Sequence, residues 1–307
     1  FFATSLNGDL SKWDMSSVTS MHGMFFQARS FNADISNWDV SRVTDMSSVF
    51  SDADIFNGDL SKWDVSSVKD MSSMFESATA FNSDLSKWDV SSVTDITEMF
   101  SWATSFNGDL SKWDVSRVTG MTLLFYDAAA FNHDLSKWDV SSVADMPSMF
   151  NSAVSFNNDV LTWDVSSVSD MTGMFMRAAS FNGDISKWDV SRVTDMTAMF
   201  RESKVFDCDL STWDVSKVSS MDFMFCDAAS FTRELCGLNW LRSKATKNSM
   251  FEGSSGLISR TECRSTLTPV THKSPHRHHR YVSSRPISER ELIARTAINT
   301  PVSTLFF

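Results

Sequence analysis

The sequence predicts an α/β repeat solenoid, in which each 25-residue coil contains one short strand and one short helix. The first observation is a tryptophan that recurs every 25 residues without insertion or deletion, at Trp13, Trp38, Trp63, Trp88, Trp113, Trp138, Trp163, Trp188 and Trp213. The second is an alternation of apolar and polar residues in the first half of each unit. The third is a spacing of three and four residues between apolar side chains in the second half. These two spacings are the periods of a strand and a helix.

The first half of a unit predicts a turn and then a strand. Residues 106–109 read Phe-Asn-Gly-Asp, which is a turn composition. Leu110, Trp113 and Val115 follow with an L-x-x-W-x-V spacing, and polar Asp114 separates the last two. We expect a short strand with Trp113 and Val115 pointing inward.

The second half of a unit predicts a helix of about two turns. Its apolar stripe consists of Val93, Ile96, Met99, Phe100 and Ala103. Thr94 and Asp95 stand at its start, where a side-chain oxygen would cap free backbone N–H groups. Because the intervening serines are poor helix formers, a single irregular or 3-10 turn is the alternative in some coils.

The repeat pattern divides the chain into three parts. Residues 1–237 form the solenoid of about nine repeats, and we expect it to be N-terminally truncated because residues 1–3 match the end of a unit. Residues 238–252 form a degenerate C-terminal cap, closed by Trp240 and Leu241. Residues 253–307 are rich in Ser, Thr, Arg, His and Pro without an apolar period, which predicts a basic, disordered tail.

The charge is distributed unevenly along the chain. The net charge is −11, but residues 1–237 carry 16 Lys and Arg against 34 Asp and Glu, whereas the rest carries 11 against 4. An acidic array repels phosphate backbones, so we expect no nucleic acid at the repeats. No apolar run approaches the roughly 18 residues of a membrane span, and the chain shows no signal peptide.

The repeat resembles a known family of bacterial surface proteins. Residues 63–71 read W-D-V-S-S-V-K-D-M, and Met74-Phe75 follows. This is similar to the 25 to 26-residue repeat of mycoplasma-type surface lipoproteins, which also occurs in algal proteins and is grouped with BspA-like leucine-rich-repeat surface proteins. The resemblance implies a leucine-rich-repeat-like solenoid at the cell surface or secreted, with adhesion or ligand binding. Two departures are the missing Asn position of leucine-rich repeats and the use of Trp, Met and Phe for Leu.

Two aspartate columns are the sharpest chemical feature of the array. The first is Asp59, Asp84, Asp109, Asp134, Asp159 and Asp184, and the second is Asp64, Asp89, Asp114, Asp139, Asp164 and Asp189. Stacked coils would place like charges about 5 Å apart. Asx-type turns, pairing with a lysine column or bound calcium would each relieve the repulsion. We expect no cofactor, because calcium-binding solenoids have Gly-rich loops and this chain has only 10 Gly.

A stripe of alternating lysine and aspartate is the candidate partner-binding surface. Both residues flank an inward tryptophan, so both should point outward. The candidates are Lys62, Asp64, Lys87, Asp89, Lys112, Asp114, Lys137 and Asp139. A solvated, salt-bridged face is the alternative interpretation.

The aromatic and sulfur-containing residues have simpler interpretations. We expect the Trp, Met and Phe columns to form the core, with Trp102 as an exposed exception at a variable position. Four cysteines lie near the end of the array, at Cys208, Cys226, Cys236 and Cys263, and their spacing does not decide between disulfides and free thiols.

These observations predict a non-catalytic surface or secreted interaction protein, which binds a protein or glycan through the solenoid face. The alternative is a structural or calcium-stiffened spacer. A glycosidase is disfavoured because a catalytic carboxylate pair needs two different environments, whereas every coil offers the same one. Ice binding by a column of Thr19, Thr44, Thr94, Thr119, Ser169 and Thr194 is disfavoured because Lys69 and Ala144 interrupt it. The oligomeric state stays open.

Overall fold

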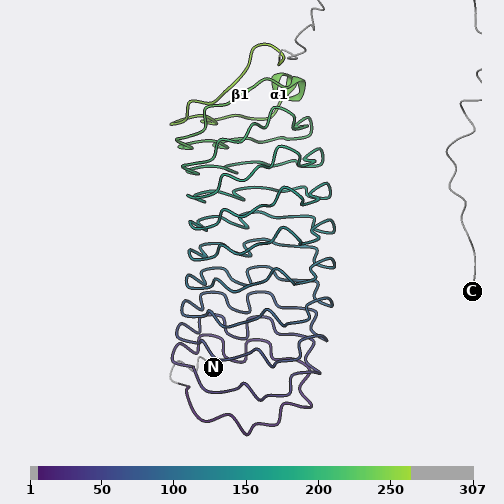
Figure 1. Ribbon diagram of the computed structural model, residues 1–307, viewed down its shortest axis with the longest axis vertical. Helices are drawn as coiled ribbons and strands as arrows, with labels where there is room; N and C mark the ends of the chain where they lie inside the picture. The colour runs from purple at the N-terminus through teal and green to yellow at the C-terminus, as the bar shows by residue number, and fades with distance from the viewer. Residues whose placement is uncertain (1–5, 264–307) are drawn as a thin grey trace, which may run out of the picture. The chain divides into compact units, whose positions relative to one another are not determined.

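The computed structural model describes residues 6–263 as a stack of 25-residue coils (Figure 1). Successive coils run parallel, and equivalent residues meet in single bridges such as Asp45 with Asp70 and Asp70 with Asp95. One column of the sequence is therefore one column of the structure. The exception is the last bridge, from Ser220 to Thr246, where the register slips by one residue.

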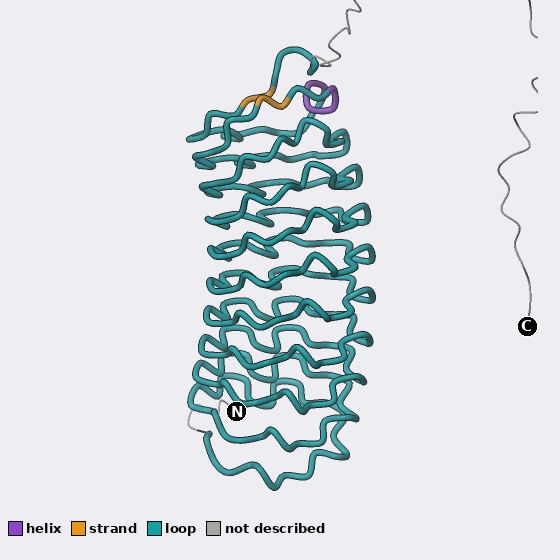
Figure 2. Tube along the Cα trace, in the orientation of Figure 1, coloured by secondary structure: helices purple, strands orange, loops and turns teal. Residues whose placement is uncertain are grey.

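The predicted fold class is wrong, because the coils contain neither the predicted strand nor the predicted helix. Within residues 6–263 the regular elements are β1 (Glu234–Leu235), α1 (Leu238–Arg242) and β2 (Leu257–Ile258), and all three lie at the C-terminal end of the stack (Figure 2). The remaining coils consist of turns and extended residues. The leucine-rich-repeat likeness that the strand and helix implied is not seen.

Hydrogen bonding explains why the predicted helix does not form. In residues 93–103, the Met99 N–H donates to the Ile96 carbonyl at 3.1 Å, which closes a four-residue turn. The amides between the turns leave the coil: Glu98 donates to Thr122 at 2.9 Å and Phe100 to Leu124 at 3.0 Å in the next coil. A helix would send every amide to a carbonyl four residues back. Overlapping four-residue turns also bring every third or fourth side chain inward, which produced the misleading helical period.

The first half of the coil is also built from turns. The Trp113 N–H donates to the Leu110 carbonyl at 3.1 Å, and the Val118 N–H donates to Val115 at 2.9 Å. Trp113 and Val115 are buried, while the Lys and Asp beside them are exposed. The predicted inward and outward alternation is therefore confirmed, although the segment is not a strand.

Columns of identical side chains fill the core, which confirms the predicted role of Trp, Met and Phe. Phe100 stacks on Phe106 within a coil at 4.0 Å between ring centroids, and on Phe125 of the next coil at 5.7 Å. The Trp113 indole N–H donates to the Leu85 carbonyl at 3.1 Å, and each buried Trp from Trp38 to Trp213 makes the equivalent bond. Trp13, 55% exposed, is an exception in the first described coil.

The final coil closes the described unit with its own set of contacts. β1 pairs in parallel with β2, and a disulfide joins Cys236 to Cys263. Trp240, in α1, donates its indole N–H to the Leu210 carbonyl at 2.8 Å and so continues the tryptophan ladder. Residues 253–263, which the sequence places in the tail, belong to this coil.

Two sequence predictions concern other parts of the chain. The disordered tail predicted for the remaining residues, 264–307, lies outside the described residues. Within residues 6–263, no helix is long and apolar enough to cross a membrane.

Candidate functional site

Aspartates begin the turns of each coil. In the two predicted columns, the Asp109 carboxylate accepts the Ser111 N–H at 2.9 Å and Asp114 accepts the Ser116 N–H at 3.1 Å. A third column does the same, as where Asp95 accepts the Thr97 N–H at 2.9 Å. Asx turns, one of the three alternatives that the sequence left open, are therefore present in these columns. The third column was missed as such, although its signal, Asp-apolar-Ser/Thr-x-apolar, occurs three times in most units.

These hydrogen bonds also stabilise the charged form of the aspartates. The side-chain and backbone hydrogen bonds from Ser116 lower the pKa of Asp114, and those from Ser111 lower the pKa of Asp109. In the described part of the chain, every ion pair uses an arginine, and none joins the Lys column to the Asp columns. Residues 6–263 also contain no group of three or more His, Cys, Asp or Glu that could hold a metal ion. Local hydrogen bonds from serine are the largest cause of the lowered pKa values, and nearby lysines, such as Lys112 beside Asp109, add a smaller effect.

The eight predicted partner-binding residues all lie exposed in two adjacent columns. Four of them come together around an open groove of about 400 Å³, which we call the Lys–Asp groove. Its lining consists of Ser111, Lys112, Trp113, Asp114, Val115, Lys137 and Asp139. Lys62, Asp64, Lys87 and Asp89 occupy the same columns in the two preceding coils.

Side-chain ladders between coils were missed by the sequence analysis. The Asn107 N–H donates to the Asn82 side-chain oxygen at 2.8 Å, and the Asn132 N–H donates to Asn107 at 2.9 Å. The threonine column is engaged in a similar way, since the Thr94 hydroxyl donates to the Lys69 carbonyl at 3.1 Å. These side chains hold neighbouring coils together. In the sequence, the asparagine column, which includes Asn107, indicated only a turn.

One part of the coil differs from coil to coil, and we call it the variable edge. It consists of two columns. One contains Gln27, Asp52, Ser77, Trp102, Asp127, Ser152, Arg177, Glu202 and Asp227. The other contains Phe26, Ser51, Glu76, Ser101, Tyr126, Asn151, Met176, Arg201 and Cys226. The first column has a positive φ in every coil from Gln27 to Asp227, whatever the residue. The backbone is therefore uniform here while the side chains are not.

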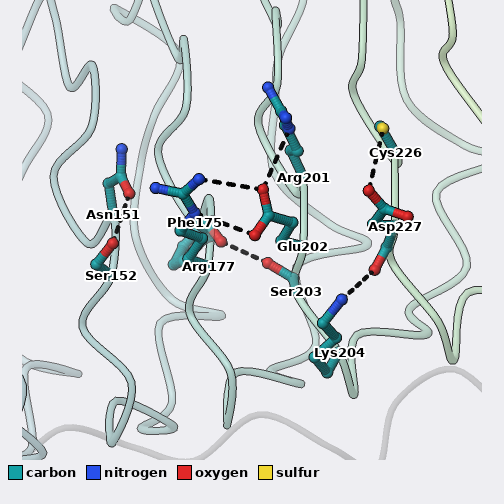
Figure 3. Close-up of polar contacts among 10 residues, drawn as sticks. All are labelled: Asn151, Ser152, Phe175, Arg177, Arg201, Glu202, Ser203, Lys204, Cys226 and Asp227. Carbon is teal, nitrogen blue, oxygen red and sulfur yellow. Dashed lines mark hydrogen bonds and ion pairs between the residues drawn. The ribbon is translucent and has the colours of Figure 1, made fainter. Parts of the chain in front are cut away.

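The C-terminal half of the variable edge is an arginine–carboxylate cluster (Figure 3). Arg177 donates to both carboxylate oxygens of Glu202, at 3.1 and 3.3 Å, and Arg201 forms an ion pair with the same carboxylate at 3.3 Å. The hydrogen bond from Arg177 lowers the pKa of Glu202. Lys204 donates to the Asp227 backbone carbonyl at 3.1 Å. Glu202 is thus bound by two arginines, although the buried Nε of Arg201 makes no hydrogen bond.

The N-terminal half of the variable edge carries an aromatic pair beside carboxylates. The ring centroids of Trp102 and Tyr126 lie 5.4 Å apart with an interplanar angle of 55°. Trp102 is 45% exposed, which confirms the predicted exception to the buried tryptophans. Asp127 follows Trp102 in its column. Among the described residues no hydrogen bond or ion pair reaches its carboxylate, and burial raises its pKa, an effect that Arg177 partly offsets.

Comparison with known families places this architecture. A family model described as "Mycoplasma protein of unknown function, DUF285" matches residues 1–101, 82–175 and 155–262. The chain belongs to this family. The three DUF285 matches overlap and extend from the first coils to the last one. The sequence resemblance to a mycoplasma-type repeat is thereby confirmed, at the level of the DUF285 repeat family.

Other comparisons add little to the DUF285 assignment. No curated protein matches the sequence. Among solved structures, the functional domain of InlJ from Listeria monocytogenes, which includes a cysteine ladder, is 13% identical with a TM-score of 0.19. The match covers 70% of this chain and 59% of that one, so the DUF285 chain spans less than two thirds of its length. A TM-score this low supports no inference about fold or function.

Proposed function

We propose that this DUF285 chain is a non-catalytic interaction protein of the cell surface or the extracellular space, which binds a protein or glycan through the Lys–Asp groove. Its resemblance to bacterial and algal surface-protein repeats, including the BspA-like group, supports the same proposal. The groove carries the argument, because it gathers four of the predicted residues around one open depression.

The charges of the groove favour binding over internal pairing. The carboxylates of Asp114 and Asp139 accept the backbone N–H groups of Ser116 and Ser141, both at 3.1 Å, which fixes their orientation. Within residues 6–263, the Lys112 and Lys137 ammonium groups make no hydrogen bond or ion pair. Lys112 and Lys137 act on Asp109 and Asp134 only through longer-range attraction, so a ligand with carboxylates or hydroxyls would meet cations that are not held in a hydrogen bond.

The Cys236–Cys263 disulfide supports the proposed location. Disulfides form and persist in oxidising compartments and are rare in the cytosol. A crosslink that closes the last coil is therefore consistent with secretion or surface display.

The test compares two lysine-to-threonine variants on a microarray of defined glycans and peptides. Thr162 and Thr212 already stand in the column of Lys112, and Thr94 and Thr119 stand in the column of Lys69, so both variants should fold. We expect Lys112→Thr to lower the affinity for the ligands of the wild-type protein by about fivefold to tenfold, which corresponds to roughly 1 kcal/mol of binding free energy. Lys69→Thr removes the same charge outside the groove and should leave binding intact. An unchanged binding profile for Lys112→Thr, or no ligand at all, would refute the groove.

A further inference from the structure

Differences between coils distinguish structural from adaptable positions in this chain. Columns with a structural task keep one residue type: Asp begins the turns, Asn joins the coils and Trp fills the core. The variable edge has the same backbone in each coil, yet its side chains range from Ser to Trp and Arg. Because each repeat contacts mainly its neighbours, a surface column can change in one coil without disturbing the rest. The Trp102 column of this edge is partly or fully exposed in every coil, so the core does not require a distinctive residue there.

Trp102 is the most distinctive residue on the variable edge. In seven of the other coils the same column holds a charged residue or serine, and the remaining one holds Gln27. The Trp102 ring is half exposed and lies against Tyr126, at an angle that leaves the two rings tilted rather than stacked. Trp and Tyr are among the residue types enriched in the energetic centres of protein interfaces.

Within the described residues, the carboxylates near this aromatic pair make no ion pair, although Arg177 acts on Asp127 from a distance. Asp127 is the next residue of the column above Trp102, and Glu98 precedes Trp102 by four residues in the same coil, at the preceding position of positive φ. Glu98 accepts only a neutral hydroxyl, from Ser73 at 3.3 Å, and Glu76 accepts one from Ser51 at 3.3 Å. In the arginine–carboxylate cluster, by contrast, Glu202 already binds two arginines.

We propose that Trp102, Tyr126 and Asp127 form a docking site for a basic segment of a partner protein, with an arginine or lysine side chain held over the Trp102 ring and against the Asp127 carboxylate. A cation over an indole is attracted by the negative face of the ring, and the unpaired carboxylate adds to that attraction. The net negative charge of the chain favours approach of the same partner. This site is separate from the Lys–Asp groove and does not depend on it.

The test measures fluorescence anisotropy of a labelled peptide, four repeats of Gly-Arg, with the full-length protein. Trp102→Ser and Asp127→Ser introduce the residue that Ser77 and Ser152 already provide in the same column, so both variants should keep the fold. We expect each variant to lower the affinity for the peptide by about fivefold to thirtyfold. Asp52→Ser makes the same change of residue and charge in that column, two coils from Trp102, and should weaken the peptide less than about twofold.

Five outcomes would overturn the docking site. A peptide with citrulline in place of arginine has the same shape without the charge, and equal binding of the two would remove the cationic ligand. Equal losses of peptide affinity in Asp52→Ser and Asp127→Ser would indicate diffuse charge attraction. Undiminished peptide binding by Trp102→Ser would show that the peptide does not contact the Trp102 ring. Failure of the arginine peptide to bind would also refute the site. Loss of peptide binding in Lys112→Thr instead would show that the peptide binds at the Lys–Asp groove. Glycan binding without peptide binding would support the proposed function and refute the docking site.

Discussion

Single aspartates shape the backbone of each coil. A carboxylate such as Asp109 accepts an N–H two residues ahead, and the turn that follows closes between Leu110 and Trp113. The hydroxyl of the same serine often adds a second bond, as where Ser66 donates to Asp64 at 2.6 Å. The negative charge of the repeats is thus largely a by-product of turn formation.

Acid should destabilise the folded protein through these aspartates. Hydrogen bonds to the ionised carboxylates hold the folded-state pKa values below the unfolded ones. The stability they contribute is therefore present above about pH 4 and is lost as pH falls through the lower folded-state values. Urea unfolding at pH 7 and pH 3 should show this loss. Asp109→Asn keeps an oxygen acceptor but cannot be protonated in this range, so it should lose less free energy of unfolding between pH 7 and pH 3. An unchanged loss would contradict this role of the Asp109 carboxylate.

Positive φ angles at non-glycine residues should cost stability. Ala198 has a φ of 56°, at the position where Gly23 and Gly173 have a φ of 60°. We expect Ala198→Gly to stabilise the protein by about 0.5–1 kcal/mol, the cost of the left-handed conformation less the entropy of glycine. Gly173→Ala should destabilise it by about 1 kcal/mol, because its Cβ would also lie 3.1 Å from the Ser148 hydroxyl. Calorimetric melting temperatures that move in the opposite order would contradict this.

At the scale of the coil, the sequence predicted which side chains lie inside better than it predicted backbone structure. The period located the core, and the Trp113 to Val115 stretch alternates as expected. The prediction of a helix was wrong because apolar spacing does not show which carbonyls accept the backbone N–H groups. The N–H groups of Glu98 and Phe100 donate to carbonyls of the next coil. The asparagine ladder was not predicted for a related reason, since its hydrogen bonds join residues 25 positions apart.

The asparagine ladder should contribute measurably to the contact between coils. Asn107→Ala removes the acceptor of the Asn132 N–H, and we expect a loss of about 0.5–1.5 kcal/mol in urea unfolding. Asn107→Asp keeps the acceptor, as Asp207 does for the Thr232 N–H at 2.9 Å, and should lose less. Equal losses in the two variants would show that the acceptor oxygen is not what matters.

The disulfide should hold the final coil on the stack. Its closed loop of 27 residues corresponds to about 3–4 kcal/mol of loop entropy. We expect Cys236→Ala to speed hydrogen exchange in residues 234–263 while the central coils keep their protection. Cys208→Ser is the control, because Cys208 is a free thiol and Ser83 occupies its column. Unchanged exchange in Cys236→Ala would contradict a stabilising role.

At the scale of the molecule, stacking turns sequence columns into surface features. The sequence predicted that the lysines and aspartates of the Lys–Asp groove point outward, because those columns are nearly uniform and one consensus unit describes them. It gave Trp102 only as an isolated exposed residue. Tyr126, which contacts Trp102, and Asp127, which belongs to the proposed site, come from the next coil, and a consensus removes the positions at which coils differ. Regular columns were predictable, and contacts between distinctive residues of adjacent coils were not.

The most direct test of the turn-built coil is a nuclear Overhauser spectrum of residues 93–103 in isotope-labelled protein. The turn-built coil predicts contacts from the Glu98 and Phe100 amides to residues 122–124, and positive φ angles at Glu98 and Trp102. Continuous contacts between residues three and four apart through 93–103, with none to residues 122–124, would establish a helix and contradict this structure.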